Sequence, residues 1–470
     1  MSVLWTATEA ALATKGIVLG DWKASGVSID SRTVKPGDLF IALSGPNCDG
    51  HDFVLKAFEA GAVAAMVHAP VPGAQVEKLL EVADTMAGLN GLARAARARS
   101  EAVVCGVTGS VGKTGVKEML KLTLSRQGRT HATEGNLNNQ WGLPLTLARM
   151  PRDTEFAVLE MGMNHTGEIS AITRLARPNV AIVTAVEAAH TEFFPSVEDI
   201  ARAKAEIFEG LEEDGVAILN RDTPHFDLMA ACARKRGARV VGFGRHIDAD
   251  LRLVARSLQP DLCIVHAVLD DQTLSYTLGV PGQHWALNSL AVLAAVQALG
   301  GDVDKAAVDL ADMRAPKGRG QRHTVALGDG EVLVIDDSYN ASPASIRAAF
   351  AVLAQSAPVG RKIAVLGDML ELGVKSPDLH ASLAEAAKAS GVDLVFTAGP
   401  LMERLHAALP EALRGGHAKD ANAIIPLVRA CVRAGDAVLV KGSAGSRMGA
   451  VVEALLNMND TSARLCANGH

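Results

Sequence analysis

The sequence predicts an α/β protein of three successive units, in which a central parallel-sheet unit with a phosphate-binding loop lies between a small N-terminal α/β unit and a further α/β unit. The chain has 470 residues, enough for about two to four domains. Segments with the apolar pattern of strands alternate with segments patterned as helices. One apolar strand, at 103–108, leads into a loop with glycines, a lysine and a hydroxyl residue.

The composition is that of a globular protein and argues against several classes of partner. Apolar residues make up 49% and charged residues 21%, so large buried cores are available. A formal net charge of -6 argues against a nucleic-acid partner. The 6 cysteines are scattered without metal-site spacing, which favours a reducing compartment. No signal peptide and no run of about 18 apolar residues is visible, so we expect a cytoplasmic protein without a membrane span.

The N-terminal unit extends to about Arg99. It is predicted to contain strands at 39–43 and 62–67 and helices at 54–60 and 85–99. Polar side chains stand at its predicted strand ends and turns, where ligands often bind, although each alone is better explained as a solvated surface group. These residues are Ser31, Arg32 and His51.

The stretch 103–114 predicts the phosphate-binding loop. Gly109 and Gly112 allow the backbone N–H groups to turn inward, Lys113 is placed to reach the outer phosphates, and Thr114 to ligate Mg2+. The apolar residues that follow have the spacing of an amphipathic helix. The match to the usual loop pattern is incomplete, because Val107 stands where a glycine is expected. The alternative is a tight turn with a surface lysine.

Further alternation predicts a mostly parallel sheet around this loop. The expected strands are 156–159, 180–184, 216–219 and 239–243, with helices at 167–176 and 197–211 between them. Ligands of such sheets bind beyond the carboxyl ends of the strands, which draws attention to the polar residues there. These are Glu160, Asn164, His165, Glu187 and His190. By themselves, Lys204 and Glu206 are better explained as solvated charges.

The remaining chain predicts a β insertion, a long helix, a linker and the third unit. The insertion is expected at 248–280, and the helix runs from about 281 to 299. The basic, glycine-bearing stretch 314–322 indicates a linker between domains. Strands of the third unit are expected at 332–335, 363–366, 394–397 and 437–440, and a polar tail from about 457.

These pieces together indicate an ATP-using enzyme that closes its domains over two further substrates. Phosphoryl transfer needs positioned metal, positive charge and exclusion of water. Thr114 and Glu160 are candidates to share one Mg2+. Arg319, in the linker, is placed either to bring a charge to the γ-phosphate or to solubilise the loop, and Asp337 is a candidate to hold the ribose.

Several stretches resemble the Mur ligases, the ATP-dependent amide ligases of peptidoglycan precursor synthesis. The phosphate loop at 108–114 looks like the variant of this family, and the similarity covers nearly the whole chain. The stretches 135–144, 159–165, 336–343 and 366–373 look most like the branch that adds D-Ala-D-Ala. The resemblance implies a central ATP-binding domain at 100–314. It also implies a UDP-MurNAc-binding domain at 1–99 and a Rossmann-like domain at 315–470 that binds D-Ala-D-Ala.

The resemblance also implies roles for single residues at the nucleotide. ATP is expected to contact Thr108, Gly109, Ser110, Val111, Gly112, Lys113, Thr114, Asn288, Arg319, Asp337, Tyr339 and Asn340. The expected Mg2+ ligands are Thr114, Glu160, His190 and Lys204, the last as a carbamate as in many Mur ligases. The catalytic set is Lys113, Glu160, His190, Lys204 and Arg319. One departure is Trp285, where many relatives carry a small polar residue.

On the substrate side, Ser31 and Arg32 match the stretch that meets the uridine diphosphate, and Asn138 and Asn139 the muropeptide side. Asn164, His165, Asp368 and Lys441 complete the expected substrate set. The implied reaction activates the terminal carboxylate of UDP-MurNAc-tripeptide as an acyl phosphate, which the amine of D-Ala-D-Ala attacks. Two alternatives remain, a sister ligase that adds a single amino acid and a nucleotide-gated regulatory protein without catalysis. The resemblance favours a monomer.

Overall fold

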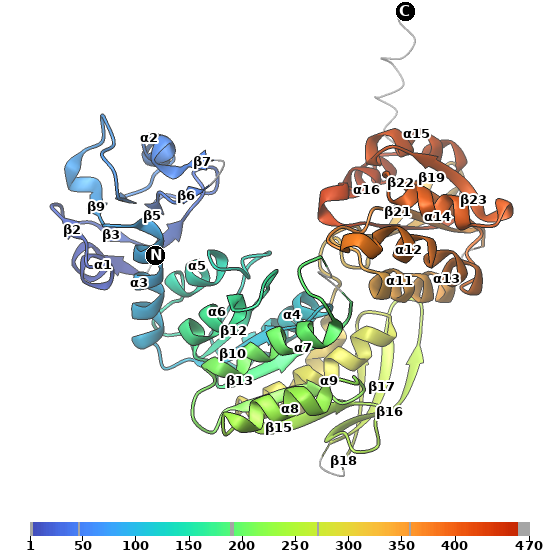
Figure 1. Cartoon of the computed structure of the whole chain (residues 1–470), viewed down its shortest axis with the longest axis horizontal. Coiled ribbons are helices and arrows are strands. Elements are labelled where there is room, and N and C mark those ends of the chain that lie inside the picture. The colour runs from blue at the N-terminus through green and yellow to red at the C-terminus, as the bar shows by residue number, and fades with distance from the viewer. Residues whose placement is uncertain (1–2, 46–47, 189–191, 270–271, 357–358, 459–470) are drawn as a thin grey trace, which may run out of the picture.

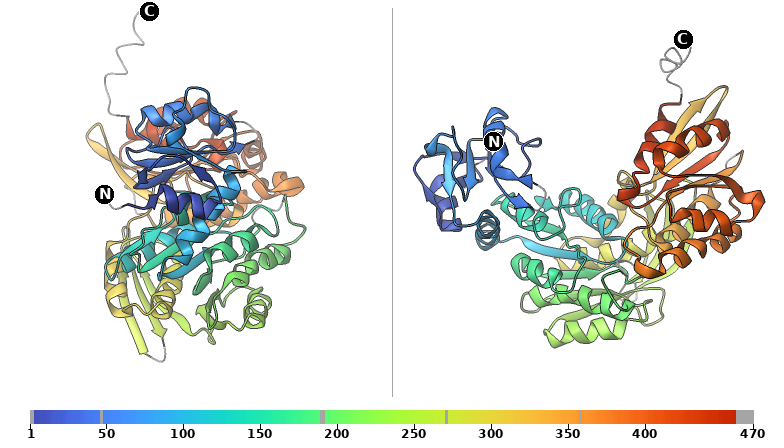
Figure 2. Two further views of the ribbon diagram at one scale, coloured as in Figure 1. Left: turned by 90° about the vertical axis from the view of Figure 1, so that its left-hand side faces the viewer. Right: turned by 45° about the horizontal axis from the view of Figure 1, so that its top comes forward.

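The computed structural model describes residues 3–45, 48–188, 192–269, 272–356 and 359–458, and these form three α/β domains arranged in an arc (Figure 1). The N-terminal and C-terminal domains stand at the two ends, and the central domain joins them (Figure 2). Each domain is built on its own main sheet, of five, nine and six strands in chain order. The three-domain α/β fold expected from the sequence is therefore confirmed.

The N-terminal domain has the sheet order β2-β9-β8-β5-β4. Its parallel strands are β4 (Gly26–Ser28), β5 (Asp38–Ile41), β8 (Ala64–Val67) and β9 (Leu79–Glu81), with β2 (Ile17–Val18) antiparallel at one edge. The helices are α1 (Ala7–Thr14), α2 (Val54–Glu59) and α3 (Thr85–Ala98). Two further pairs of short strands are present. β1 (Trp5–Thr6) pairs with β3 (Lys23–Ala24), and β6 (Ser44–Gly45) pairs with β7 (Cys48–Asp49). Leu39, Met66 and Leu80 bury their side chains against the helices.

The central sheet has the order β11-β12-β10-β13-β14-β15-β16-β17-β18. The parallel part comprises β10 (Val103–Thr108), β11 (Thr130–Ala132), β12 (Phe156–Glu160), β13 (Val180–Val183), β14 (Val216–Asn220) and β15 (Arg239–Gly244). The predicted β insertion is confirmed as β16 (Leu251–Leu258), β17 (Cys263–Leu269) and β18 (Gln272–Leu278), which pair antiparallel.

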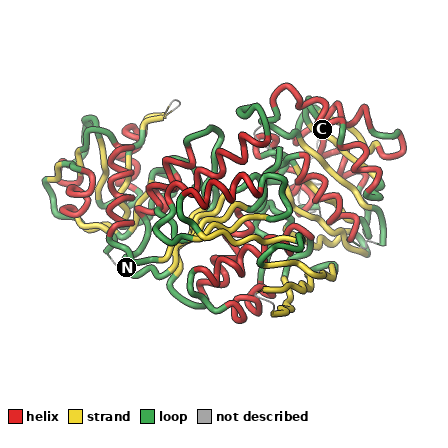
Figure 3. The backbone as a smooth tube through the Cα atoms, turned by 60° about the horizontal axis from the view of Figure 1, so that its bottom comes forward, coloured by secondary structure: helices red, strands yellow, loops and turns green. Residues whose placement is uncertain are grey.

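Helices cover both faces of this sheet (Figure 3). One face packs on α4 (Lys113–Ser125) and α9 (Gln283–Ala298), and α10 (Val303–Asp309) lies beside them. The other face packs on α5 (Gly142–Ala148), α6 (Glu168–Ala176), α7 (Val197–Ala205) and α8 (Phe226–Lys235). Alternate residues of β10 serve the two cores, Cys105 and Val107 on the first face and Val104 on the second. Such a strand is buried on both sides, which explains its continuous apolar run.

The helix expected at 197–211 is not continuous. It ends as α7 at Ala205 and tightens into a 3₁₀ segment, Glu206–Gly210. The tighter turn lets the Glu206 carboxylate cap α6, where it accepts bonds from the N–H groups of Gly167 (2.7 Å) and Ser170 (3.1 Å). Lys204 and Glu206 are only 2% and 9% exposed. The interpretation of these two residues as solvated charges is therefore wrong.

The C-terminal sheet has the order β19-β20-β24-β21-β22-β23. Its strands are β19 (Gln321–Leu327), β20 (Gly330–Asp337), β21 (Lys362–Gly367), β22 (Leu394–Ala398), β23 (Arg414–Ala418) and β24 (Ala437–Lys441). One face packs on α11 (Pro343–Gln355), α13 (Leu383–Ala389) and α14 (Met402–Ala408), and the other on α15 (Ala421–Cys431) and α16 (Gly449–Leu456). A short helix, α12 (Ser376–Ala381), precedes α13.

The linker is shorter than the sequence suggested. The stretch 314–322 was expected to be irregular, but β19 begins at Gln321 and pairs antiparallel with β20 through a full hairpin. The predicted tail from 457 lies mostly outside the described residues. Within the described part of the chain, no helix combines the length and the apolar character needed to cross a bilayer.

Candidate active site

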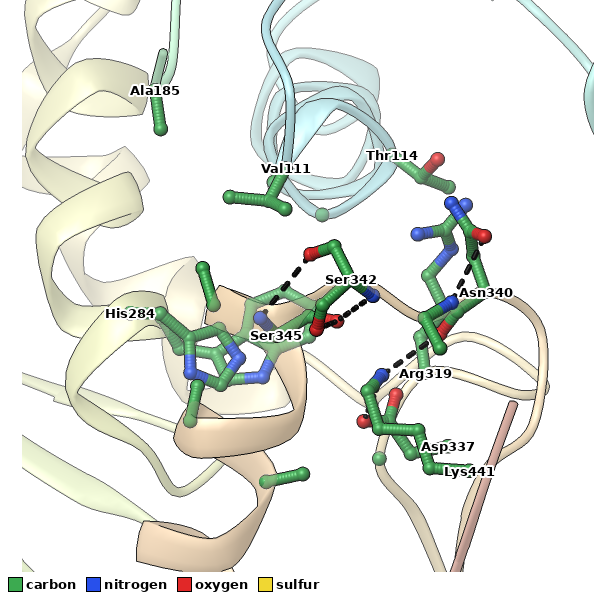
Figure 4. Close-up of a pocket in the computed structure, with 18 of the residues that line it drawn as sticks. Val111, Thr114, Ala185, His284, Arg319, Asp337, Asn340, Ser342, Ser345 and Lys441 are labelled. Carbon is green, nitrogen blue, oxygen red and sulfur yellow. Dashed lines mark hydrogen bonds and ion pairs between the residues drawn. The ribbon is translucent and has the colours of Figure 1, made fainter. Parts of the chain in front are cut away.

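A cavity of about 370 Å3 lies where the central domain meets the C-terminal domain. The central domain contributes the loop before α4, the end of β13 and the start of α9. The linker, the end of β20 and the start of α11 form the opposite wall. Val111 and Thr114 lie on one side of this cleft, and Ser342, Asn340 and Asp337 on the other (Figure 4). The cleft therefore opens beyond the carboxyl ends of strands in both sheets, as expected for α/β folds.

The loop between β10 and α4 has the geometry of an anion-binding loop. Gly109 (φ +148°) and Gly112 (φ +88°) adopt backbone conformations that favour glycine. Two bonds to the β13 end fix the loop: Ser110 N–H donates to the carbonyl of Ala185 (2.8 Å), and Thr184 Oγ1 donates to that of Val111 (2.6 Å). The first N–H groups of α4 have no partner within the helix and point toward the cleft.

Three charged residues expected in the site act on one another. Lys113 begins α4, and its Nζ donates to the Gly109 carbonyl (2.6 Å). Burial lowers the pKa of Lys113, the Glu160 carboxylate opposes this shift, and the Arg319 guanidinium adds to it. The loop, the end of β12 and the linker thus bring Lys113, Glu160 and Arg319 together around one position.

Glu160 has an uncompensated carboxylate oxygen. Its side chain is 2% exposed, and Oε1 accepts a bond from Asn138 Nδ2 (2.8 Å). Oε2 has no hydrogen-bond partner among the described residues. A buried, unpaired carboxylate oxygen is costly unless a cation meets it, and oxygen ligands suit Mg2+. These residues fit Mg2+, with the Thr114 hydroxyl at the nearby helix start as a second oxygen.

The expected Mg2+ ligands also include Lys204 and His190. Among the described residues, no group of three or more His, Cys, Asp or Glu side chains surrounds a possible metal position. A site with fewer protein ligands is normal for Mg2+, which keeps water and substrate phosphates in its shell. His190 lies outside the described residues.

Lys204 is buried in α7, 2% exposed, and its amine is paired with no carboxylate of the described residues. Burial lowers the pKa of its amine well below the usual value, and the nearby Lys113 charge lowers it further. A buried lysine without a counter-ion favours the neutral amine, which is nucleophilic.

On the C-terminal side, Asp337 forms an ion pair with Lys441 (2.7 Å), and Lys441 Nζ also donates to the carbonyl of Asn340 (2.9 Å). Burial raises the pKa of Asp337, which the Lys441 and Arg319 charges oppose. The Arg319 guanidinium lies 4.3 Å from the centre of the Tyr339 ring. Arg319 is thus held by stacking, although it stands in the linker.

The start of α9 closes the cleft from the central domain. Asn288 is 8% exposed and lies against Gly112 of the loop. His284 borders the cleft, and desolvation by the surrounding protein lowers its pKa to about 4, helped by the Lys441 charge. His284 is therefore neutral near pH 7.

Several expected substrate residues lie away from this cleft. Arg32 is an exposed partner of Asp30 in the N-terminal domain, and Ser31 stands beside it. Asn139 Oδ1 caps α5 by accepting from Gly142 N–H (2.9 Å). Backbone N–H groups of Asn164 and His165 donate to the Glu168 carboxylate (2.7 and 3.2 Å). Asp368 is 7% exposed and caps α14 through Met402 N–H (2.8 Å).

Other cleft residues were not identified from the sequence. Thr184, which anchors the phosphate loop, was assigned only to the end of a strand. Ser342 and Ser345 exchange two hydrogen bonds (3.3 and 2.8 Å) at the start of α11, which faces the loop (Figure 4). The order serine, proline and serine there is a helix-start signal that was available in the sequence.

Comparisons with known proteins agree on one family. Three family models match in order: "Mur ligase family, catalytic domain" at 23–97, "Mur ligase middle domain" at 107–296 and "Mur ligase, glutamate ligase domain" at 318–444. The UDP-N-acetylmuramoyl-tripeptide–D-alanyl-D-alanine ligase of Escherichia coli is 37% identical over 439 residues, covering 93% of this chain and 94% of the relative.

Two solved structures extend this similarity to the fold. MurF from Acinetobacter baumannii has a TM-score of 0.85 and 30% identity, covering 96% of this chain and 99% of that one. The MurF ligase of Thermotoga maritima in complex with ADP has a TM-score of 0.79 and 30% identity, covering 93% and 98%.

Proposed function

The chain belongs to the Mur ligase family, and we propose that it joins D-alanyl-D-alanine to UDP-MurNAc-tripeptide with ATP. The observation that carries this proposal is the 37% identity to a ligase of that name over 93% of the chain. The product would be the UDP-MurNAc-pentapeptide precursor of peptidoglycan, released with ADP and phosphate.

ATP is assigned to the cleft between the central and C-terminal domains. The N–H groups and side chains of 108–114 hold the phosphates, and the adenine lies toward Asn288. Asp337 holds the ribose, with Tyr339 and Asn340 beside the nucleotide. This placement is supported by the loop geometry, and the relative from Thermotoga maritima was solved with ADP.

The proposed reaction has two steps. An oxygen of the tripeptide carboxylate attacks the γ-phosphorus, the bond to the β-phosphate oxygen breaks, and ADP leaves. The amine of D-Ala-D-Ala then attacks the carbonyl carbon, a proton is lost from nitrogen, and phosphate leaves. Lys113 and Arg319 stabilise the negative charge on the transferring group. Domain closure excludes water from the acyl phosphate.

Mg2+, when bound, supplies charge neutralisation and orientation of the phosphate oxygens. Thr114 and Glu160 would hold it, and Asn138 keeps the Glu160 carboxylate oriented through its 2.8 Å bond. We extend the assignment to His190 and to a carbamate on Lys204. The lack of a counter-ion at Lys204 among the described residues supports the carbamate, because it favours the neutral amine, and only a neutral amine can attack CO2 and release a proton to give the carbamate.

We propose the substrate domains from the same similarity. Residues 1–99 would bind the UDP-sugar through Ser31 and Arg32, and 100–314 the ATP and muropeptide through Asn138, Asn139, Asn164 and His165. Residues 315–470 would bind D-Ala-D-Ala. Asp368 and Lys441 are proposed for the substrate side of this domain, and both also have structural contacts, Asp368 in the cap of α14 and Lys441 beside Asp337. A cytoplasmic monomer is the expected form.

Phosphate release from ATP tests the proposal. Release that requires both UDP-MurNAc-tripeptide and D-Ala-D-Ala, with a pentapeptide product, is expected. Release with a single amino acid in place of the dipeptide would instead indicate a sister ligase. No release with any combination would contradict a catalytic role and favour a nucleotide-gated regulator.

A further inference from the structure

Three glycines, two in the phosphate loop and one in the first turn of α4, are spaced three residues apart, and each faces a side chain from a neighbouring segment. A Cβ atom built on Gly109 would lie 2.0 Å from Thr184 Oγ1, and one on Gly112 would lie 2.7 Å from Asn288 Nδ2. One on Gly115 would lie 2.8 Å from Cζ3 of Trp285. The loop is therefore in close contact with its surroundings at three successive points.

Gly115 differs from the other two glycines. Gly109 and Gly112 have positive φ angles, which by themselves explain why glycine is present at these two positions. Gly115 lies inside α4 (Lys113–Ser125) and has no positive φ angle. Within a helix, alanine is more stable than glycine by about 1 kcal/mol. The choice of glycine at 115 therefore needs a reason outside its own backbone.

The reason is the indole of Trp285. Besides the contact to Cζ3, a Cβ on Gly115 would lie 3.0 Å from Cη2 and 3.5 Å from Cε3, all atoms of the six-membered ring. Trp285 is 5% exposed and belongs to the same apolar core as Val116 of α4. A packed indole cannot move aside as the end of a flexible side chain can. Glycine at 115 and tryptophan at 285 thus require each other.

The contact joins the two segments on which nucleotide binding depends. Gly115 follows directly on Lys113 and Thr114, in the first turn of α4. Trp285 is in the first turn of α9, one turn before Asn288, and α9 therefore contacts the loop region at Gly112 and at Gly115. Sub-ångström placement of such groups decides how well a phosphate is bound.

We propose that Trp285 is a positioning residue for the nucleotide: its indole fills the space beside Gly115 and fixes the start of α4, with Lys113 and Thr114, against the start of α9, with Asn288. The indole acts through the loop backbone and does not itself contact phosphate. This inference rests on the proposed binding of ATP in the cleft.

A double-mutant cycle tests the proposal, with calorimetric titration of ADP and Mg2+ into the full chain. Gly115→Ala should raise the Kd for ADP at least about tenfold, because the methyl group displaces the first turn of α4. Trp285→Leu removes the six-membered ring and should weaken binding by a smaller factor. In the Trp285→Leu background, Gly115→Ala should cause no further loss, because the clashing atoms are gone.

Gly91→Ala is the matched control. Gly91 is also a helical glycine, in α3, and its Cβ would lie 2.4 Å from the Ala13 carbonyl oxygen, far from the cleft. This variant should lower the melting temperature and leave the Kd for ADP unchanged. The split between melting temperature and Kd separates positioning of the nucleotide from general destabilisation.

An unchanged Kd in Gly115→Ala would overturn the proposal, as would equal losses in both backgrounds. If Gly115→Ala alone does not fold, a double variant that folds and binds like Trp285→Leu supports the proposal, and one that also fails to fold contradicts it. The titration does not depend on ligation. A wild-type chain that binds ADP without ligating would contradict only the proposed function, and one that does not bind ADP contradicts both.

Discussion

The N-terminal domain meets the central domain through a shared apolar core, whereas the C-terminal domain meets it through a linker and a polar cleft. Leu145 and Ala148 of α5 belong to the same buried cluster as Trp5 and Leu39 of the N-terminal domain. Trp5 Nε1 donates to the Ala148 carbonyl (2.9 Å) inside that core. A core that spans two domains makes them behave as one body.

Buried polar bonds strengthen the same junction. Arg149 Nε donates to the Val27 carbonyl (2.6 Å), and Arg97 Nε to that of Ala176 at the end of α6 (2.8 Å). The apolar clusters of the C-terminal domain, by contrast, contain only residues from Val325 onward among the described residues. The difference indicates that the C-terminal domain is the one free to move, and the nucleotide site lies at its junction.

The comparison predicts that the site at the cleft can be disabled without loss of stability. Lys113→Ala should lower the ligation rate at least about 10³-fold, equal to about 4 kcal/mol, because a phosphate contact is lost. The melting temperature should stay within experimental error, since the one hydrogen bond that the Lys113 side chain makes among the described residues is to the Gly109 carbonyl. Phosphate release and a thermal melt check both. Wild-type turnover in this variant would rule out the loop assignment.

The shared core should be the stability-determining junction. Trp5→Ala removes an indole that is 1% exposed and should cost about 3 kcal/mol of unfolding free energy. Urea unfolding measures this, and the Kd for ADP should not change. Leu12→Ala, at an 82% exposed position of the same domain, is the control and should change little. Equally small effects of Trp5→Ala and Leu12→Ala would show that the shared apolar core does not hold the N-terminal domain to the central domain.

Lys204 is buried close enough to Lys113 for the two charges to interact, and its replacement tests the carbamate. Lys204→Ala should reduce ligation about 100-fold, equal to about 2.7 kcal/mol, and short carboxylic acids in the assay should restore part of the rate. Arg202→Ala, at an exposed position two residues earlier in α7, should leave the rate unchanged. Full activity of Lys204→Ala without added acid would exclude a carbamate at this position.

A loosely joined C-terminal domain should unfold in its own transition. Lowering the pH should destabilise this domain selectively. His380 is fully buried, accepts from Met369 N–H (3.0 Å) and lies 2.7 Å from the Ser376 carbonyl through Nδ1. Burial lowers its pKa, so the unfolded chain binds the proton first. The contribution of neutral His380 to the free energy of unfolding is therefore fully present above about pH 6.5. It is lost as the pH falls, by at most about 1.4 kcal/mol at pH 5.5.

Denaturant unfolding at pH 7.5 and 5.5 measures this loss, which should fall on the C-terminal transition alone. His380→Gln should show less pH dependence, whereas His246→Gln, at an exposed position of the central domain, should behave like wild type. A single transition for the whole chain would show that the two junctions are equally tight.

The smallest effect is expected from a surface ion pair at the tight junction. Nη2 of Arg152 lies 2.5 Å from Oε1 of Glu9, and the two side chains are 46% and 40% exposed. Arg152→Ala should cost less than about 1 kcal/mol, and high salt should remove the difference from wild type. A loss as large as that of Trp5→Ala would mean that charges and not the apolar core fasten this junction.

Elements with strong local signals were predicted accurately. The strands at 103–108 and 156–159 and the helix from 85 have continuous or periodic apolar patterns, and each is present within a residue or two. The phosphate loop could be predicted because its glycines, lysine and threonine are contiguous. The strand β19 was missed, since its first two residues, Gln321 and Arg322, belong to the stretch predicted as a basic linker, and the strand is defined by its pairing with β20.

By itself, the sequence determined the α/β class, the loop at 108–114 and the family, because these depend on residues close together in the chain. Only the tertiary structure decided that Glu206 caps α6, that Lys204 is buried without a counter-ion among the described residues and that Trp285 fills the space beside Gly115. Each of those facts depends on contacts between distant segments, whose burial and charge interactions arise only when the sheets and helices pack.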